Sequence, residues 1–409
     1  MLKELEKTAS FLGLRQSMIG LLGMVILVGI GEKMAERFLP IYLLAVGGGA
    51  LSIGLLNGLD NLLSALYSFP GGYLSERLGV KRALLIFNLM AMAGFIIVIL
   101  IPIWTAVILG SVLFLSWTAI SLPASMSLVA KVLPKDKRTM GVSMHSLVRR
   151  VPMALGPVIG GLFISLWGER NGVRMAFVAA LTMAVVALIM QQKMITDDRP
   201  DEKDDHGQPL TKNPFKAVQL ISPALRNLLV SDILIRFCEQ IPYAFVVVWC
   251  MKIIMSPVSA VQFGLLTAVE MVTAMLIYIP VAYLADRSTK KPFVVMTFVF
   301  FTLFPLAILF CQSFWLLVGA FVLRGLKEFG EPTRKALIMD LAAEGRKAAT
   351  FGLYYLMRDT VVSLAAFSGA FLWMISPHTN FLTAFAFGLA GTVLFALKGS
   401  DLQRVGDPQ

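Results

Sequence analysis

Twelve apolar runs follow one another along this chain, each long enough to cross a bilayer as a helix. A spanning helix needs about 20 mostly apolar residues, and a chain that repeats such runs has few folds open to it besides a helical membrane bundle. The runs lie approximately at 17–46, 50–75, 82–102, 104–132, 140–167, 173–192, 225–253, 259–285, 292–311, 314–341, 349–375 and 380–398.

Composition agrees with a membrane location. Of the 409 residues, 57% are hydrophobic and only 15% are charged, whereas a soluble globular chain is about 45–50% apolar and about 25% charged. Three cysteines and three histidines provide no disulfide framework and no metal-ligand spacing. We therefore expect no metal and no other cofactor. The first apolar run lacks a small-residue cleavage pattern, so it is interpreted as a span and not as a removable signal.

One long polar segment divides the runs into two sets of six. It begins with TDDRPDEKDD at Thr196, and its charge density and Pro/Gly content are typical of a solvated linker. We predict an all-α membrane protein with a six-helix bundle at 1–195, a cytoplasmic linker at 196–222 and a second six-helix bundle at 223–409.

The positions of lysine and arginine predict the orientation. The N-terminus, the linker, the C-terminus and four basic loops lie on one side, while the opposite loops carry little more than Arg170, Arg174 and Lys252. By the positive-inside rule the basic side is cytoplasmic. The net charge of +11 is then a topology signal, and no nucleic-acid partner is needed. We expect a monomer in the cytoplasmic (inner) membrane of a prokaryote, with both termini inside.

A charged turn occurs twice, 210 residues apart. The stretch GGYLSERLGVKR, Gly71 to Arg82, aligns with VAYLADRSTKKP, Val281 to Pro292. The preceding helices align as well, with GLLNGLD (Gly54–Asp60) over GLLTAVE (Gly264–Glu270). Two homologous halves imply a pseudo-two-fold axis along the membrane normal and a solute pathway at the interface of the halves.

The first copy of this turn resembles the signature of the major facilitator superfamily, Gly-x-Leu-Ala-Asp-Arg-x-Gly-Arg-Lys. The matching residues are Gly72, Leu74, Arg77, Gly79 and Lys81, while Glu76 replaces the aspartate and Val80 an arginine. The second copy keeps Asp286, Arg287 and Lys290 but has Ala282 and Thr289 where the glycines belong. The resemblance covers nearly the whole chain and implies a secondary transporter.

The resemblance also implies that the charged turn is a gate. In that family the carboxylate and arginine latch the two halves together when the transporter opens outward. The alternative interpretation is a topology anchor, for which a basic loop alone would suffice. The gating candidates are Gly72, Glu76, Arg77, Gly79, Lys81, Arg82, Asp286, Arg287 and Lys290.

Many ionisable residues lie inside the apolar runs, where they are costly and usually face a cavity or one another. Seventeen of them are taken as candidates, nine acids and eight bases, so near-complete internal pairing within this set is possible. The i,i+4 spacing favours structural pairs Arg324–Glu328 and Lys327–Glu331. The alternative is that the charges line a pathway. The resemblance places the pathway on helices 1, 4, 7 and 10, supported by 2, 5, 8 and 11, and runs 3, 6, 9 and 12 carry almost no charge.

Two sets of candidates follow for a transporter. Carboxylates that change their environment during transport would load and release a proton; these are Glu32, Glu36, Asp60, Asp232, Glu239 and Glu270. Of these, Glu36 and Asp60 rank first because Lys33 and Arg37 lie nearby. Arginines at mid-depth suit an anionic group because the guanidinium donates two parallel hydrogen bonds. The substrate-binding candidates are Arg149, Arg150, Arg236, Arg324, Lys327, Glu328, Arg358 and Asp359.

Three smaller signals bear on the transport mode. The motif GPVIGG resembles a helix-5 motif of the superfamily's drug/proton antiporters, with candidates Gly156, Pro157, Gly160 and Gly161. The alternative is ordinary glycine packing. The ERF stretch that starts at Glu36 is similar to part of helix 1 of proton-coupled peptide transporters, although Lys33 replaces their first glutamate. His145 is a candidate proton shuttle or a hydrogen-bonded structural residue.

We interpret the chain as a proton-coupled secondary transporter that exports a small organic solute by alternating access. The alternatives are a proton symporter importing a charged metabolite or peptide, a transporter of a lipid-like substrate, and a membrane-embedded enzyme. The sequence has no phosphate-binding GxxxxGK[ST] loop, so direct ATP-driven transport is not expected. The expected partners are the substrate, protons and the lipid bilayer.

Overall fold

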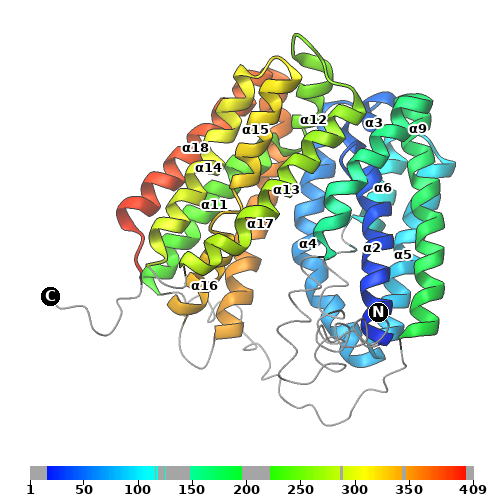
Figure 1. The fold of residues 1–409 in the computed structure, drawn as a ribbon, viewed down its shortest axis with the longest axis horizontal. Helices are drawn as coiled ribbons and strands as arrows, with labels where there is room; N and C mark the ends of the chain where they lie inside the picture. The colour runs from blue at the N-terminus through cyan, green and yellow to red at the C-terminus, as the bar shows by residue number, and fades with distance from the viewer. Residues whose placement is uncertain are drawn as a thin grey trace, which may run out of the picture. The chain divides into compact units, whose positions relative to one another are not determined.

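The computed structural model describes residues 16–115, 117, 125, 148–195, 222–285, 289–342 and 347–401. In these ranges all regular secondary structure is helical, as expected (Figure 1). The chain divides into two compact units. Unit 1 comprises Met1–Lys203 and Val258–Ala268, and unit 2 comprises Asp204–Pro257 and Val269–Gln409.

Six helices in the described ranges are long and apolar enough to cross a membrane. A seventh is obtained if the bent pair Pro223–Tyr243 and Val246–Ile253 is one span. The six are Val80–Leu100, Arg150–Met194, Ala260–Ile277, Lys291–Phe310, Thr350–Ile375 and Pro377–Lys398. The total of twelve spans and the two six-helix bundles stay predictions.

The described helices of unit 1 are α2 (Gln16–Glu36), α3 (Leu39–Ala45), α4 (Ala50–Leu78), α5 (Val80–Leu100), α6 (Trp104–Phe114) and α9 (Arg150–Met194). Helix α9 is kinked at Gly168, whose φ of 75° is in the left-handed region that favours glycine. The sequence places a loop between two apolar runs at this point. Helix α9 packs along α2 and α5, and Phe95, Phe114 and Phe177 join α5, α6 and α9 in one aromatic cluster.

Glycines of the helix-5 motif let α9 approach the charged part of α2 closely. A Cβ at Gly156 would lie 2.6 Å from Cβ of Lys33, and a Cβ at Gly160 would overlap the backbone oxygen of Met34. Small residues are the usual means by which membrane helices come this close. The motif therefore packs against the turn of α2 that carries Glu32 and Lys33.

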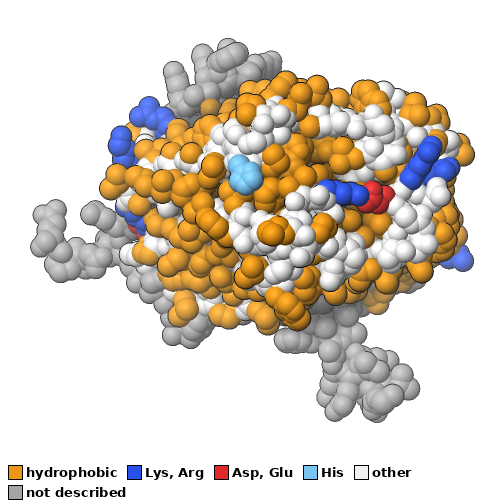
Figure 2. All heavy atoms as spheres, turned by 90° about the horizontal axis from the view of Figure 1, so that it is seen from above, with side chains coloured by type: hydrophobic (Ala, Val, Ile, Leu, Met, Phe, Trp, Pro, Cys, Tyr) orange, Lys and Arg blue, Asp and Glu red, His pale blue; other side chains and the backbone are white. Residues whose placement is uncertain are grey.

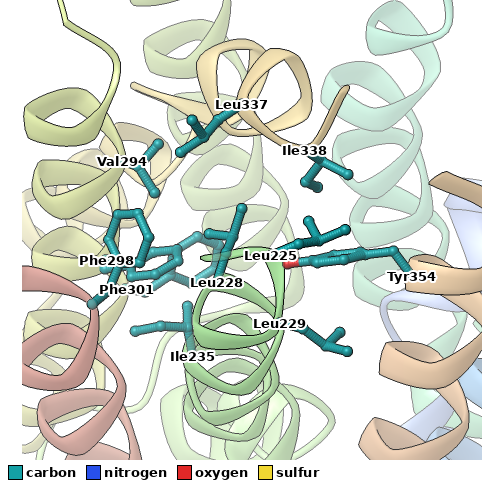
Figure 3. Close-up of a cluster of buried hydrophobic side chains, with 11 residues drawn as sticks. Leu225, Leu228, Leu229, Ile235, Val294, Phe298, Phe301, Leu337, Ile338 and Tyr354 are labelled. Atoms are coloured by element: carbon teal, nitrogen blue, oxygen red, sulfur yellow. The ribbon is translucent and has the colours of Figure 1, made fainter. Parts of the chain in front are cut away.

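Unit 2 contains α11 (Pro223–Tyr243), α12 (Val246–Val248), the π-helical turn η3 (Trp249–Ile253), most of α13 (Ala260–Ala285), α14 (Lys291–Phe310), α15 (Phe314–Leu326), α16 (Glu331–Leu341), α17 (Lys347–Ile375) and α18 (Pro377–Lys398). Helix α11 packs against α14, α16, α17 and α18. Figure 3 shows the apolar cluster at this junction, which is formed by Leu225, Leu228, Leu229, Ile235, Val294, Phe298, Phe301, Leu337, Ile338, Tyr354 and Phe395.

The sequence predicts continuous helices at 17–46, 225–253 and 314–341, and each of these predictions is wrong at one point. Helix α2 ends before α3, α11 ends before α12 with a bend of 42°, and α15 ends before α16. The prolines Pro40, Pro242 and Pro332 lie at the three breaks. Pro40 and Pro332 lie in the first turn of α3 and α16, where a missing N–H costs nothing, and Pro242 lies in the last turn of α11. Proline has no N–H for the carbonyl four residues back and clashes with it, which disfavours continuation of the preceding helix.

The outer surface is apolar, as a chain dissolved in lipid requires. Side chains that would be buried in a water-soluble protein are widely exposed; examples are Leu100, Leu166, Leu276, Phe310 and Trp315. Figure 2 shows one face of the molecule, on which hydrophobic side chains predominate and charged ones are few.

Gly160→Ala tests the close approach of α2 and α9. The added methyl group would overlap the Met34 carbonyl, so we expect the free energy of unfolding in detergent to fall by about 1–3 kcal/mol. Gly319→Ala is the matched control, because a Cβ at Gly319 meets nothing within 4 Å. Equal stability of the two variants would contradict the packing described here.

Candidate functional site

Ten ionisable side chains of unit 2 form one continuous network in which acids and bases alternate. We call it the charge network. In order of contact its members are Asp359, Arg358, Asp232, Arg334, Glu331, Arg236, Glu239, Lys327, Glu270 and Arg324. Five are acids and five are bases, so the network is neutral when all ten are ionised. They come from α11, α13, α15, α16, α17 and the turn between α15 and α16.

Asp232 on α11 is contacted by three guanidinium groups. Arg334 donates to Oδ2 at short range, Arg358 donates to the same oxygen from 3.4 Å, and the hydroxyl of Tyr354 donates to it from 2.9 Å. The other oxygen, Oδ1, lies 3.8 Å from Nε of Arg236. Because the Asp232 and Arg334 side chains are each only 1% exposed, neither charge can be solvated by water. Each therefore depends on the other.

The middle of the network joins α16 to α11. Arg334 holds Glu331 with two hydrogen bonds, of 3.0 and 2.6 Å, which is the bidentate geometry that favours arginine over lysine. Arg236 reaches Glu331 at 3.4 Å and Glu239 at 2.7 Å. The spacing of Asp232, Arg236 and Glu239 along α11 places them on one face of that helix.

The far end of the network involves α13 and α15. Lys327 lies 2.8 Å from Glu239 and 3.2 Å from Glu270, and Nε of Arg324 lies 3.3 Å from Glu270. The guanidinium of Arg324 is also surrounded by aromatic rings, at 5.0 Å from Phe304, 5.5 Å from Tyr243 and 5.7 Å from Phe321. These distances are within the range of cation–π attraction.

A small cavity opens beside this end of the network. Its polar lining comes from Glu239, Arg324 and Lys327, and its apolar walls include Tyr243, Phe301 and Phe304. At this cavity, charges of the network border empty space. Nothing in the cavity has the composition of a metal site, since no group of three or more His, Cys, Asp or Glu side chains gathers among the described residues.

A smaller charged cluster lies in unit 1, on α2 and α4. Lys33 contacts Glu36 at short range and Glu32 at 3.4 Å, and Glu32 is only 4% exposed. Asp60 on α4 lies within electrostatic range of Glu36 and Lys33. Arg149, directly before α9, lies within electrostatic range of Glu32. Arg150 is the first residue of α9 and is partly buried.

Several predicted site residues therefore come together, but not in the pairs that the sequence predicts. The predicted pairs Arg324–Glu328 and Lys327–Glu331 are wrong. The i,i+4 rule requires a continuous helix, whereas the chain leaves helical geometry between Leu326 and Glu331. The partners of Arg324 and Lys327 lie instead on α13 and α11.

Sequence reasoning missed Arg334 and Tyr354. Arg334 is the largest fully buried side chain in the described ranges, and it links Asp232 to Glu331. A signal was present, because Arg334 follows Glu331 by three residues and an i,i+3 pair shares a helix face. Tyr354 carried no such signal, since its hydroxyl partner Asp232 is 122 residues away.

The gating candidates divide into described and undescribed residues. Gly72, Glu76 and Arg77 lie in α4 and Arg82 in α5, and Gly79 has the positive φ of 84° that the turn requires. Lys81 donates to the carbonyl of Gln192, and Gln191 donates to the carbonyl of Lys81. In the second copy Lys290 contacts Asp340 at short range. Asp286, Arg287 and His145 lie outside the described residues.

Comparison with known families gives a match along nearly the whole chain. A family model described as the Major Facilitator Superfamily matches residues 21–257 and 245–407. An uncharacterised MFS-type transporter of Methanocaldococcus jannaschii is 21% identical over 377 residues, which are 90% of this chain and 90% of that protein.

Solved structures of transporters share the fold. A mutant of the peptide transporter POT superposes with a TM-score of 0.77 at 17% identity and covers 94% of this chain and 93% of its own. A mutant of the nucleoside transporter NupG gives 0.78 at 13% identity, with 93% and 99% covered. A bacterial homologue of the human lysosomal transporter Spinster gives 0.67 at 15% identity, with 94% and 95% covered. At these identities the likeness concerns the fold.

Asp232→Asn tests the role of Asp232 in the network. The substitution removes the negative charge that Arg334 and Arg358 share, so we expect the free energy of unfolding in detergent to fall by about 3–5 kcal/mol. Asp340→Asn is the control, because the Asp340 and Lys290 side chains are 31% and 25% exposed and such a pair contributes less than about 1 kcal/mol. A loss at Asp232 no larger than that at Asp340 would show that the network does not stabilise unit 2.

Proposed function

This chain belongs to the Major Facilitator Superfamily, and from that premise we propose that it moves a small organic solute across the cytoplasmic membrane by alternating access, driven by the proton gradient. The family relationship makes it a multi-pass membrane transporter and not an enzyme. The proton coupling, the solute class and the direction are the proposal. We propose outward movement, with proton-driven import of a charged metabolite as the competing mode.

The charge network is the observation that carries this proposal. A membrane protein that needed only stability would gain nothing from nine ionisable side chains that are at most 18% exposed, with Asp359 at their edge, because each buried charge must be desolvated before it can be paired. Intramembrane ionisable residues of this kind mark substrate or proton pathways. In this chain the network borders a cavity at Glu239, Arg324 and Lys327.

A second observation supports the placement of the pathway. Helix α2 breaks between Glu36 and Leu39, and α11 breaks between Tyr243 and Val246. A shift of 207 residues, three fewer than the shift that aligns the charged turns, relates both breaks, and the same shift relates the buried Glu32 to Glu239. Interrupted helices at corresponding positions of two repeats are the best pointer to a transporter's binding site. We therefore propose that 1–195 and 223–409 are the two repeats, and that Glu32 and Glu239 occupy corresponding positions in them.

The proposal assigns three groups of residues. Proton coupling is assigned to Glu32, Glu36, Asp60, Asp232, Glu239 and Glu270. Solute binding is assigned to the cavity end of the network, while Arg236 and Arg358 are better explained as partners of Asp232, Glu239 and Glu331, which they contact. The charged turns keep their role as the gate at the cytoplasmic end.

Transport into and out of sealed proteoliposomes tests the proposed function. With an imposed pH gradient, a panel of radiolabelled amino acids, peptides, nucleosides and amphipathic drugs should show at least one solute that accumulates against its gradient. The direction of the pH gradient that drives accumulation shows whether solute and proton move in opposite directions, as in export, or in the same direction, as in import. Movement of no solute, or movement unaffected by collapsing the pH gradient with an ionophore, would overturn the proton-coupled mechanism.

The variants Glu36→Gln and Asp60→Asn test the proton-coupling site in unit 1. A side chain that cannot ionise cannot carry the proton, so we expect gradient-driven transport to be lost while exchange of solute without a gradient continues. Glu169→Gln, beside the kink at Gly168, is the control. Gradient-driven transport with normal pH dependence in both variants would remove these carboxylates from the mechanism.

Charge reversal at the turns tests the gate. Arg77→Glu or Asp286→Arg should raise the labelling of cysteines introduced at the cytoplasmic end and slow transport, with the protein still inserted. Arg226→Glu makes the same charge change at an exposed position of α11. If labelling and transport are both unchanged, the turns are topology anchors.

A further inference from the structure

Arg324 has hydrogen-bonding capacity that its surroundings leave unused. Its guanidinium carries five N–H donors, and the residue as a whole is only 4% exposed. The ion pair from Nε to Glu270, at 3.3 Å, is its polar contact, and among the described residues no hydrogen bond leaves its terminal nitrogens. The three aromatic rings around it attract the charge but accept hydrogen bonds only weakly. Because Arg324 lines the cavity, an acceptor in the cavity could bind these donors, whereas donors left without an acceptor are costly.

The hydrogen-bonding groups left free in the cavity lining favour a negatively charged ligand. Both oxygens of Glu239 are occupied, one by Arg236 at 2.7 Å and the other by Lys327 at 2.8 Å. The cavity therefore presents spare donors from Arg324 and no spare carboxylate from Glu239. A cation would find both oxygens of Glu239, the carboxylate in the cavity lining, already taken, whereas a planar oxyanion would find a fork that donates two parallel hydrogen bonds.

The residues that line the cavity indicate the chemical character of the remainder of the ligand. Tyr243, Phe300, Phe301 and Phe304 line it together with Val246. Aromatic faces gain most from burying another flat or apolar group.

We propose that Arg324 and these aromatic side chains form a subsite for the carboxylate of an organic anion that carries an aromatic or other apolar group. This inference rests on the proposed function, since it names the class of solute that the transporter accepts. The carboxylate would lie on the terminal nitrogens of Arg324, with its apolar part against Phe304 and Tyr243.

Binding of such an anion is linked to a proton. Glu270 holds Arg324 in this structure, and a second carboxylate on the same cation places two negative charges side by side. The complex stays neutral when Glu270 takes up one proton from solution as the anion binds. The other charged or titratable groups near this pair are Lys327, Glu239, Glu328, Tyr243 and Cys250. Glu239 and Lys327 already neutralise each other, so Glu270 is the group whose charge must change.

The test is binding to the purified full-length protein in detergent by isothermal titration calorimetry. The probes are phenylacetate, neutral phenylacetamide and cationic phenethylamine, which share one ring and differ in charge. Phenylacetate should bind, and the other two should bind at least about tenfold more weakly. Its affinity should fall as the pH rises, by up to about tenfold per pH unit, the limit for one linked proton.

Three variants locate the site. Arg324→Lys should weaken phenylacetate binding about tenfold or more, because lysine lacks the planar fork. Glu270→Gln should strengthen binding and abolish its pH dependence, since the competing carboxylate is gone. Arg174→Lys is the matched control; Arg174 donates to the carbonyl of Ile99 in unit 1 and should leave binding unchanged.

Equal affinities for phenylacetate and phenylacetamide, or unchanged pH-dependent binding in Glu270→Gln, would overturn the subsite. If Arg324→Lys does not fold, the affinity and pH dependence of phenylacetate binding to Glu270→Gln decide whether the subsite exists. Because binding is measured without a gradient, failure here alongside gradient-driven transport in proteoliposomes would remove the subsite and keep the proposed function. Binding of phenylacetate with no gradient-driven transport of any solute would keep the subsite and remove the proposed function.

Discussion

Neutralisation of buried charge by neighbouring charge is the constraint on which the interior of unit 2 depends. An ion in an apolar medium has no water to stabilise it, so each carboxylate must lie against a cation with good geometry. The network meets this requirement by alternation from Asp359 to Arg324. Its members come from helices far apart in sequence, which means that the charges also fix how α11, α13, α16 and α17 pack. The apolar cluster around α11 packs beside the network, and Tyr354 of this cluster (Figure 3) donates a hydrogen bond to Asp232 of the network.

The membrane also constrains the breaks in the helices, because backbone groups freed at a break cannot bind water. A non-helical segment inside an apolar bundle frees backbone groups that must find partners within the protein. At the break after α15, the N–H of Gly330 donates to the hydroxyl of Thr297 on α14, at 2.5 Å. The interruption is therefore satisfied locally, and it turns Glu331 and Arg334 toward α11. Without the break, Lys327 and Glu331 would lie on one face of a straight helix and pair with each other.

Much of the architecture was predictable because it depends on local signals. Length and apolarity predict the spans at Val80–Leu100 and Lys291–Phe310, and the glycine at position 79 predicts the tight turn between α4 and α5. The membership of the charge network was largely predictable too, since ionisable residues in apolar runs are visible in the sequence. Its pairing was not. Arg334 and Asp232 are 102 residues apart, and their contact depends on helix packing, which no local pattern encodes.

The alternation of charges also explains how a buried network can take part in a moving protein. Glu239 is shared by Arg236 and Lys327, and Glu331 by Arg334 and Arg236. A carboxylate with two cationic neighbours can lose one as a helix shifts and stay paired with the other, so a small motion exchanges partners and leaves no charge bare. Isolated pairs lack this property, because breaking one costs the full desolvation of both ions. Arg324 ends the chain of contacts beside the cavity, and in the subsite that we propose an anionic solute would replace the last protein carboxylate there.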